Sequence, residues 1–122
     1  MSVRGLPPGY AIKDGIAVRL DTLPDNTPEE ALLGKIRSVA TSHGFLVYHT
    51  YRSTKSEPGF PDLILCNGVS LLMYELKTNT GQLTKEQALW LSLLAHTEKV
   101  ESGIWRPRDW PAIYERLTRR TR

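Results

Sequence analysis

Residues 59–77 read GFPDLILCNGVSLLMYELK, and this stretch decides the fold of the chain. In its middle stands Asn67-Gly68, a dipeptide typical of a two-residue hairpin turn. The apolar runs on either side are typical of β-strands, so we expect antiparallel strands over residues 62–66 and 69–77. The second run is apolar on both faces through Met73, which predicts a central strand covered by helices on both sides.

Apolar residues at helical spacing precede and follow this hairpin. Residues 27–42 open with TPEE, which we interpret as a capping box in which Thr27 is the N-cap and Glu30 its partner. Residues 84–96 open with TKEQ, a second box of the same kind. Both segments are therefore predicted to be helices.

The remaining segments complete one sheet between helices. Residues 45–51 and 100–105 are rich in aromatic and β-branched side chains, which predicts two more strands. A last helix is expected from Asp109 or Trp110 to about Arg119. From residue 27 the order is α-β-β-β-α-β-α, which predicts an α/β fold with a central mixed sheet of about four strands flanked by helices.

Length and composition allow one compact domain. The chain has 122 residues with 40% hydrophobic content, which is enough for one core and too little for two. We divide it into an N-terminal extension, residues 1–26, with a short strand at about 16–20, and one domain, residues 27–122. The lone Cys66 excludes an internal disulfide, and no apolar run approaches the roughly 20 residues of a membrane span. We therefore expect a cytoplasmic protein with no membrane partner.

Positive charge is unevenly distributed. The formal net charge is +3, but arginine dominates from Arg106 to the C-terminus. A solvated helix face and a phosphate-contacting surface are both consistent with this pattern. If the partner is a nucleic acid, we expect phosphate contacts from the loop after residue 51 and from the last helix, through Arg52, Lys55, Arg116, Arg119 and Arg120.

Acidic and basic residues interrupt the apolar face of the central strand. Because side chains alternate along a strand, Glu75 and Lys77 project from the same face, and Asp62 opens the neighbouring strand. Two carboxylates brought together repel each other unless a cation lies between them, and oxygen ligands favour Mg²⁺ or Mn²⁺. A metal, a carboxylate pair and a lysine are the parts that phosphodiester hydrolysis needs. A simple ion pair at a strand end is the alternative interpretation.

The ordered set of these motifs resembles a known family. GFPD at residues 59–62, ELK at residues 75–77 and Gln87 on the following helix are similar to the VRR-NUC branch of the PD-(D/E)xK nuclease superfamily, in its stand-alone phage or bacterial form. The resemblance covers about residues 28–120. It implies a restriction-endonuclease-like core in which Asp62, Glu75 and the backbone carbonyl of Leu76 bind Mg²⁺ or Mn²⁺.

The resemblance also implies an acid on the first helix and a glutamine on the second. Glu29 and Glu30 both qualify; we favour Glu29, because Glu30 is assigned to the capping box and Glu29 lies on the inward stripe of the helix. Gln87 is assigned either to its capping box or to an active-site contact, and we expect that it cannot fill both roles completely. Lys77 would orient the attacking water.

The predicted function is a metal-dependent DNA endonuclease. The resemblance implies a homodimer that cuts branched DNA such as four-way junctions, in a bacterial or phage-infected cell. The alternative is a nucleic-acid-binding or assembly protein that keeps the scaffold without the chemistry. We assign Cys66 to a buried strand position, and we interpret the tryptophans and His96 as structural. For His49 a role near the scissile phosphate stays open.

Overall fold

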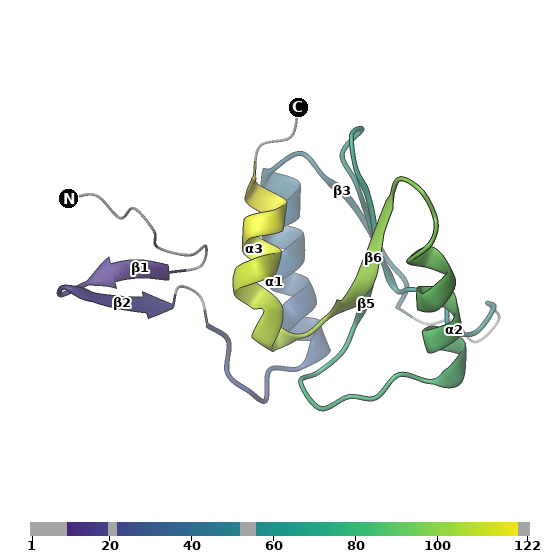
Figure 1. The fold of residues 1–122 in the computed structure, drawn as a ribbon, viewed down its shortest axis with the longest axis horizontal. Helices are drawn as coiled ribbons and strands as arrows, with labels where there is room; N and C mark the ends of the chain where they lie inside the picture. Colours follow the sequence, from purple (N-terminus) through teal and green to yellow (C-terminus); the bar gives the residue numbers. More distant parts are fainter. Residues whose placement is uncertain (1–9, 20–21, 52–55, 120–122) are drawn as a thin grey trace.

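The computed structural model describes residues 10–19, 22–51 and 56–119. Within this part of the chain the elements follow in the order shown in Figure 1: β1 (Tyr10–Lys13), β2 (Ile16–Arg19), α1 (Glu29–Ser42), β3 (Leu46–His49), β4 (Leu63–Cys66), β5 (Leu71–Leu76), α2 (Lys85–Leu94), β6 (Val100–Trp105), a short 3-10 turn (Pro107–Asp109) and α3 (Trp110–Thr118).

A four-stranded mixed sheet forms the centre of the molecule. Its strand order is β3-β4-β5-β6; β4 is antiparallel to both of its neighbours, β3 and β5, whereas β5 and β6 are parallel. Helices α1 and α3 lie side by side on one face, and α2 lies on the other (Figure 1). The predicted α/β class with a mixed sheet between helices is therefore confirmed, as is the order of elements from α1 onward.

The main core lies between the sheet and the α1/α3 layer. Leucines from the central strands pack there against apolar side chains of both helices, which buries the middle of this face of the sheet. The buried residues are Leu32, Leu33, Ile36, Ala40, Phe45, Leu63, Leu65, Leu72, Leu76, Trp105, Trp110, Ile113 and Leu117. By contrast α2 contributes no fully buried residue, so the opposite face is more thinly covered.

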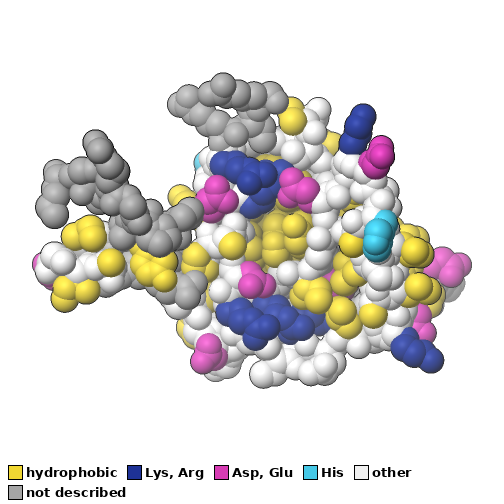
Figure 2. Space-filling view, in the orientation of Figure 1, with side chains coloured by type: hydrophobic (Ala, Val, Ile, Leu, Met, Phe, Trp, Pro, Cys, Tyr) yellow, Lys and Arg dark blue, Asp and Glu magenta, His cyan; other side chains and the backbone are white. Residues whose placement is uncertain are grey.

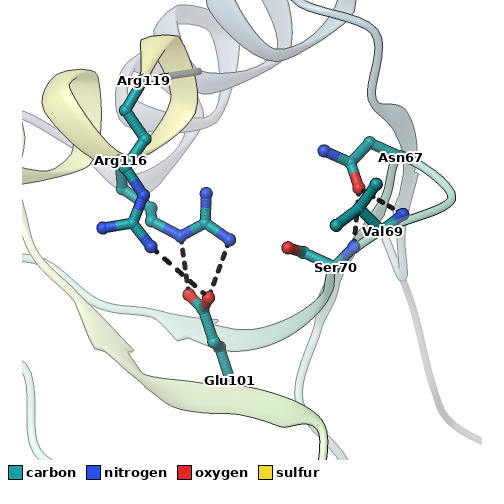
Figure 3. Close-up of polar contacts among 6 residues, drawn as sticks. All are labelled: Asn67, Val69, Ser70, Glu101, Arg116 and Arg119. Atoms are coloured by element: carbon teal, nitrogen blue, oxygen red, sulfur yellow. Dashed lines mark hydrogen bonds and ion pairs between the residues drawn. The ribbon is translucent and has the colours of Figure 1, made fainter. Parts of the chain in front are cut away.

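The turn between β4 and β5 differs from the prediction. Cys66 pairs with Leu71, so the turn has four residues, and the Asn67 side chain closes it by accepting hydrogen bonds from the backbone N–H groups of Val69 and Ser70 (Figure 3). A two-residue turn would have paired Cys66 with Val69. The longer turn shifts the register by two residues, so that Leu63 pairs with Tyr74 and the preceding Asp62 lies beside Glu75.

The predicted capping box at the start of α1 is wrong. The helix begins at Glu29, with Pro28 as N-cap and without a side-chain cap. The Thr27 hydroxyl instead donates to the carbonyl of Pro24 at 2.7 Å, and so does its backbone N–H at 3.1 Å. Thr27 therefore closes the preceding turn, and no cap engages Glu30. The box at the start of α2 is confirmed, with Thr84 and Gln87 in the predicted roles.

The N-terminal extension contains a hairpin where one strand was predicted. β1 and β2 pair with each other in a separate two-stranded sheet. The turn between them is Asp14-Gly15, and both residues have positive φ angles, 52° and 79°, as a hairpin turn of the primed type requires. The Asp-Gly dipeptide was a readable signal for this hairpin. No helix in the described ranges is both long and apolar enough to cross a membrane.

Candidate active site

Two carboxylates meet where β5 ends. Asp62 directly precedes β4, and its Oδ1 accepts a hydrogen bond from the backbone N–H of Leu76 at 3.1 Å. Glu75, the neighbour of Leu76 in β5, has only 4% of its surface exposed. The register of the hairpin thus brings together all three residues that were predicted as metal ligands.

Gln87 joins the second carboxylate to α2. Its Nε2 donates to Oε2 of Glu75 at 2.9 Å, while its Oε1 accepts from the backbone N–H of Thr84 at 2.9 Å. The expectation that capping and an active-site contact exclude each other is therefore wrong. The amide has a donor end and an acceptor end, and each fills one role. The capping box consequently orients the group that holds Glu75.

Burial and mutual repulsion disfavour negative charge at this site. Burial raises the pKa of the Glu75 carboxyl to about 7, and the charge of Asp62 acts in the same direction. Burial also raises the pKa of Asp62, against the opposing effects of the Leu76 hydrogen bond, His49 and Lys77. The charge of Lys77 lowers the pKa of both acids but does not offset their burial.

One oxygen of this pair has no partner. Oε1 of Glu75 is buried without a hydrogen bond, although its other oxygen is held by Gln87. A buried carboxylate oxygen without a hydrogen-bond donor is unusual, and such an oxygen could serve as a ligand to a cation. In the described residues no group of three His, Cys, Asp or Glu side chains is arranged to hold a metal. A site here would therefore combine two carboxylates with a backbone oxygen and water.

The acid from α1 lies close to this pair. Glu29 is exposed on the first turn of α1, and its charge contributes to the raised pKa of Glu75, whereas Glu30 does not enter among the causes. Both glutamates line a groove of about 500 Å³ that also reaches Asp62. Because Thr27 does not form the predicted capping box, one reason for preferring Glu29 to Glu30 no longer holds. The effect of the Glu29 charge on the pKa of Glu75 provides another reason.

His49 contacts the first carboxylate. Its Nε2 lies 3.7 Å from Oδ2 of Asp62, its Nδ1 is buried without a partner, and its ring meets that of Tyr51 edge to face at 4.9 Å. The sequence placed His49 on the strand before GFPD but did not indicate this contact, because the contact depends on how β3 pairs with β4.

The GFPD motif has a structural explanation residue by residue. Gly59 has φ +88°, and a Cβ at this position would clash with the backbone of Glu86 in the first turn of α2. Phe60 meets Trp90 of α2 edge to face at 5.1 Å, and Pro61 is fully buried. The motif therefore fixes the loop against α2 and positions Asp62 at the start of β4.

A larger groove opens over the carboxylates. It has a volume of about 580 Å³ and reaches Asp62, Glu75 and Gln87. It shares Thr50, Tyr51 and Asp62 with the smaller groove beside α1. Asp62 thus lines both grooves, whereas Glu75 lines only the larger one.

The predicted phosphate contacts need a correction at Arg116. This side chain is buried and makes two hydrogen bonds, of 2.8 and 2.7 Å, to the carboxylate of Glu101 in β6 (Figure 3). Arg119 lies 3.9 Å from the same carboxylate and is half exposed. Arg52, Lys55 and Arg120 lie outside the described residues.

The register also separates these arginines from the carboxylates. Glu101 pairs with Leu72, whereas Glu75 pairs with Ile104, so the ion pair lies three residues, or about 10 Å, back along the sheet. Figure 2 shows two groups of Lys and Arg side chains on the face formed by α3 and β6, with apolar side chains between them. The guanidinium of Arg116 is bonded to Glu101, so we do not expect this residue to contact phosphate.

Two arginines that were not named individually as phosphate contacts lie beside the loop after Lys77 and beside the smaller groove. Arg108 is exposed, and its backbone N–H donates to Asn79, in the loop that follows Lys77. Arg37 of α1 lines the smaller groove with Glu29 and Asp62. Arg37 was missed, because a single arginine on a helix is common on protein surfaces, whereas Arg108 belongs to the arginine-rich stretch that begins at Arg106.

Cys66 and one of the tryptophans lie in environments that differ from the predicted ones. Cys66 is exposed on β4, so the prediction of a buried position is wrong. Trp105 and Trp110 are buried packing residues as predicted, whereas Trp90 lines the larger groove. No protein-family model, no curated protein and no solved structure matches this chain.

Proposed function

We propose that this chain is a Mg²⁺- or Mn²⁺-dependent DNA endonuclease of the PD-(D/E)xK type. The observation that carries the proposal is the Glu75 carboxyl: it is buried beside Asp62, its pKa is raised to about 7, and one of its oxygens has no partner. A divalent cation is the ligand that would relieve the repulsion and satisfy that oxygen.

Each residue of the site has a role in this proposal. Asp62, Glu75 and the backbone carbonyl of Leu76 would hold the ion. When bound, the ion would lower the pKa of an attacking water and offset charge developing on the phosphate. Lys77 steadies the water, Gln87 keeps the Glu75 carboxylate oriented through its 2.9 Å hydrogen bond, and Glu29 acts through water from α1.

The proposed substrate is branched DNA, cut by a homodimer in the cytoplasm. This part of the proposal depends on the resemblance of the motifs to those of VRR-NUC nucleases.

The test is cleavage of linear and four-way DNA by protein of measured size, with Mn²⁺ as the only divalent ion. We expect a dimer that cuts four-way DNA preferentially, and we expect Glu75→Gln and Lys77→Ala to lower the rate by about 100-fold or more. Glu98→Gln is the matched control, because Glu98 is an exposed acid in the loop before β6.

Three results would count against the proposal. A monomer that cuts both substrates alike contradicts the branched-DNA and dimer proposal. Cleavage that survives Glu75→Gln contradicts the site. DNA binding without cleavage, unchanged by the two substitutions, supports the alternative of a binding protein on a nuclease scaffold.

A further inference from the structure

The α2 face of the sheet is only partly covered. Helix α2 packs against β6, while on the edge strand β3 the side chains on the same face remain open to solvent. Tyr48, which pairs with Ile64 and so shares a face with Asp62, is 60% exposed. The groove of about 580 Å³ lies between this uncovered strand and α2.

Aromatic side chains from several parts of the fold line this groove. They come from β3 and the residues just after it, from the GFPD loop and from α2, and the polar groups of the site complete the lining. The aromatic residues are Tyr48, Tyr51, Phe60 and Trp90.

Packing explains only part of this cluster. Phe60 and Trp90 hold the GFPD loop against α2 through their edge-to-face contact at 5.1 Å. Tyr51 is 76% exposed; its ring meets that of His49 edge to face, and its hydroxyl accepts a 3.4 Å hydrogen bond from Arg37. Tyr48 is 60% exposed as well. These exposed aromatic rings lie beside buried acids, and they contribute little to the stability of the fold because they bury little of their surface.

Exposed aromatic rings next to a phosphate-binding centre suit a particular ligand. Nucleobases stack on aromatic side chains whatever their sequence, because every base has a π face. Bases in a continuous duplex are already stacked on their neighbours, so only an unpaired or extruded base can enter such a groove. An unpaired nucleotide would present its base to the aromatic groups and its phosphate to the carboxylates and their ion.

We propose that the groove lined by Tyr48, Tyr51, Phe60 and Trp90 binds an unpaired nucleobase of a DNA strand whose phosphate lies over Asp62 and Glu75. The proposal rests on the proposed function and narrows its substrate class. DNA with an unstacked nucleotide at the cut, as at a strand junction, is a better substrate than continuous duplex.

The test measures binding rather than cleavage. The probes are a short, fluorescently labelled oligothymidylate and an abasic oligomer of equal length and charge, each titrated with the full chain in Ca²⁺ and followed by fluorescence anisotropy. We expect the protein to bind the oligothymidylate about tenfold more tightly than the abasic oligomer. Tyr48→Ala removes most of this preference without weakening binding of the abasic oligomer, and Tyr48→Phe retains it.

The chain offers a matched control for Tyr48. Leu46 lies on the same face of β3, two residues away, is 79% exposed and does not line the groove. Leu46→Ala should leave both affinities unchanged. Because Tyr48 is an exposed residue of an edge strand, its substitution is expected to leave the fold intact, and circular dichroism checks this.

The outcomes separate this inference from the proposed function. A preference for bases that depends on Tyr48, without cleavage in Mn²⁺, supports the base-binding groove and contradicts the nuclease. Cleavage that depends on Glu75, with equal affinity for both oligomers, contradicts the groove alone. The inference is also overturned if Tyr48→Ala lowers the affinity for both oligomers equally, or if the protein binds neither oligomer.

Discussion

The Glu75 carboxyl links the stability of the fold to pH. Its pKa is about 7 in the folded chain and near 4.5 when unfolded, so the folded state holds the proton more tightly. In metal-free protein the free energy of unfolding should therefore fall as the pH rises from about 4.5 to about 7. Thermal melting in EDTA across this range measures the effect. Glu75→Gln should reduce the decline, and Mn²⁺ should raise the melting temperature above pH 7 by binding the ionised form.

Glu101 provides a control with the opposite sign. Its hydrogen bonds with Arg116 lower the pKa of this carboxyl. The ionised carboxylate therefore stabilises the fold at pH values above its ordinary pKa of 4.5, and this stabilisation is lost as the pH falls. Glu101→Gln should therefore destabilise the chain at pH 7, where Glu75→Gln should not. A decline between pH 4.5 and 7 that is unaffected by Glu75→Gln would contradict the assignment of the raised pKa.

At the scale of elements, the contact between the GFPD loop and α2 holds the site together. Gly59 combines a φ of +88° with a backbone approach to Glu86 that leaves no space for a Cβ. We expect Gly59→Ala to destabilise the chain by about 3 kcal/mol, since a strained φ and a steric clash add. Urea unfolding measures this cost.

Gly68 isolates the contribution of the clash. It has nearly the same φ, +89°, but a Cβ there would meet nothing within 4 Å. Gly68→Ala should therefore cost only about 1 kcal/mol, the backbone contribution alone. Because Gly59→Ala moves the helix that carries Gln87, it should also lower cleavage more than Gly68→Ala does. Equal costs for the two substitutions would mean that the loop moves freely away from α2.

At the scale of the whole molecule, the arginines divide into structural and exposed sets. Arg116 joins α3 to β6 through Glu101, so Arg116→Ala should destabilise the chain by about 1.5–3 kcal/mol and leave the salt dependence of DNA binding unchanged. Arg108→Ala should do the reverse, lowering the salt slope by about one with little effect on stability. Binding titrations at several salt concentrations check both; a reduced slope for Arg116→Ala would reinstate that residue as a phosphate contact.

Short-range patterns in the sequence predicted much of this architecture. The apolar runs around Asn67-Gly68 indicated β4 and β5, the TKEQ box located the start of α2, and residues 100–105 matched β6 to the residue. These features depend on neighbours within a few positions, where side-chain alternation and capping geometry act directly. The pairing of Asp62 with Glu75 was also expected, although from a turn two residues too short.

Only the tertiary structure decided how these parts combine. The Asn67 side chain set the turn length and thereby the register, and Thr27 closed a turn in place of capping α1. Gln87 filled two roles because the packing of α2 brings its amide within hydrogen-bonding distance of Glu75. The sequence by itself singled out the residues that we propose as the site, and local hydrogen bonding sufficed for most of the elements. The orphan oxygen of Glu75, the aromatic groove and the separation of Arg116 from the site depend on contacts between distant segments, whose energies are set by packing in three dimensions.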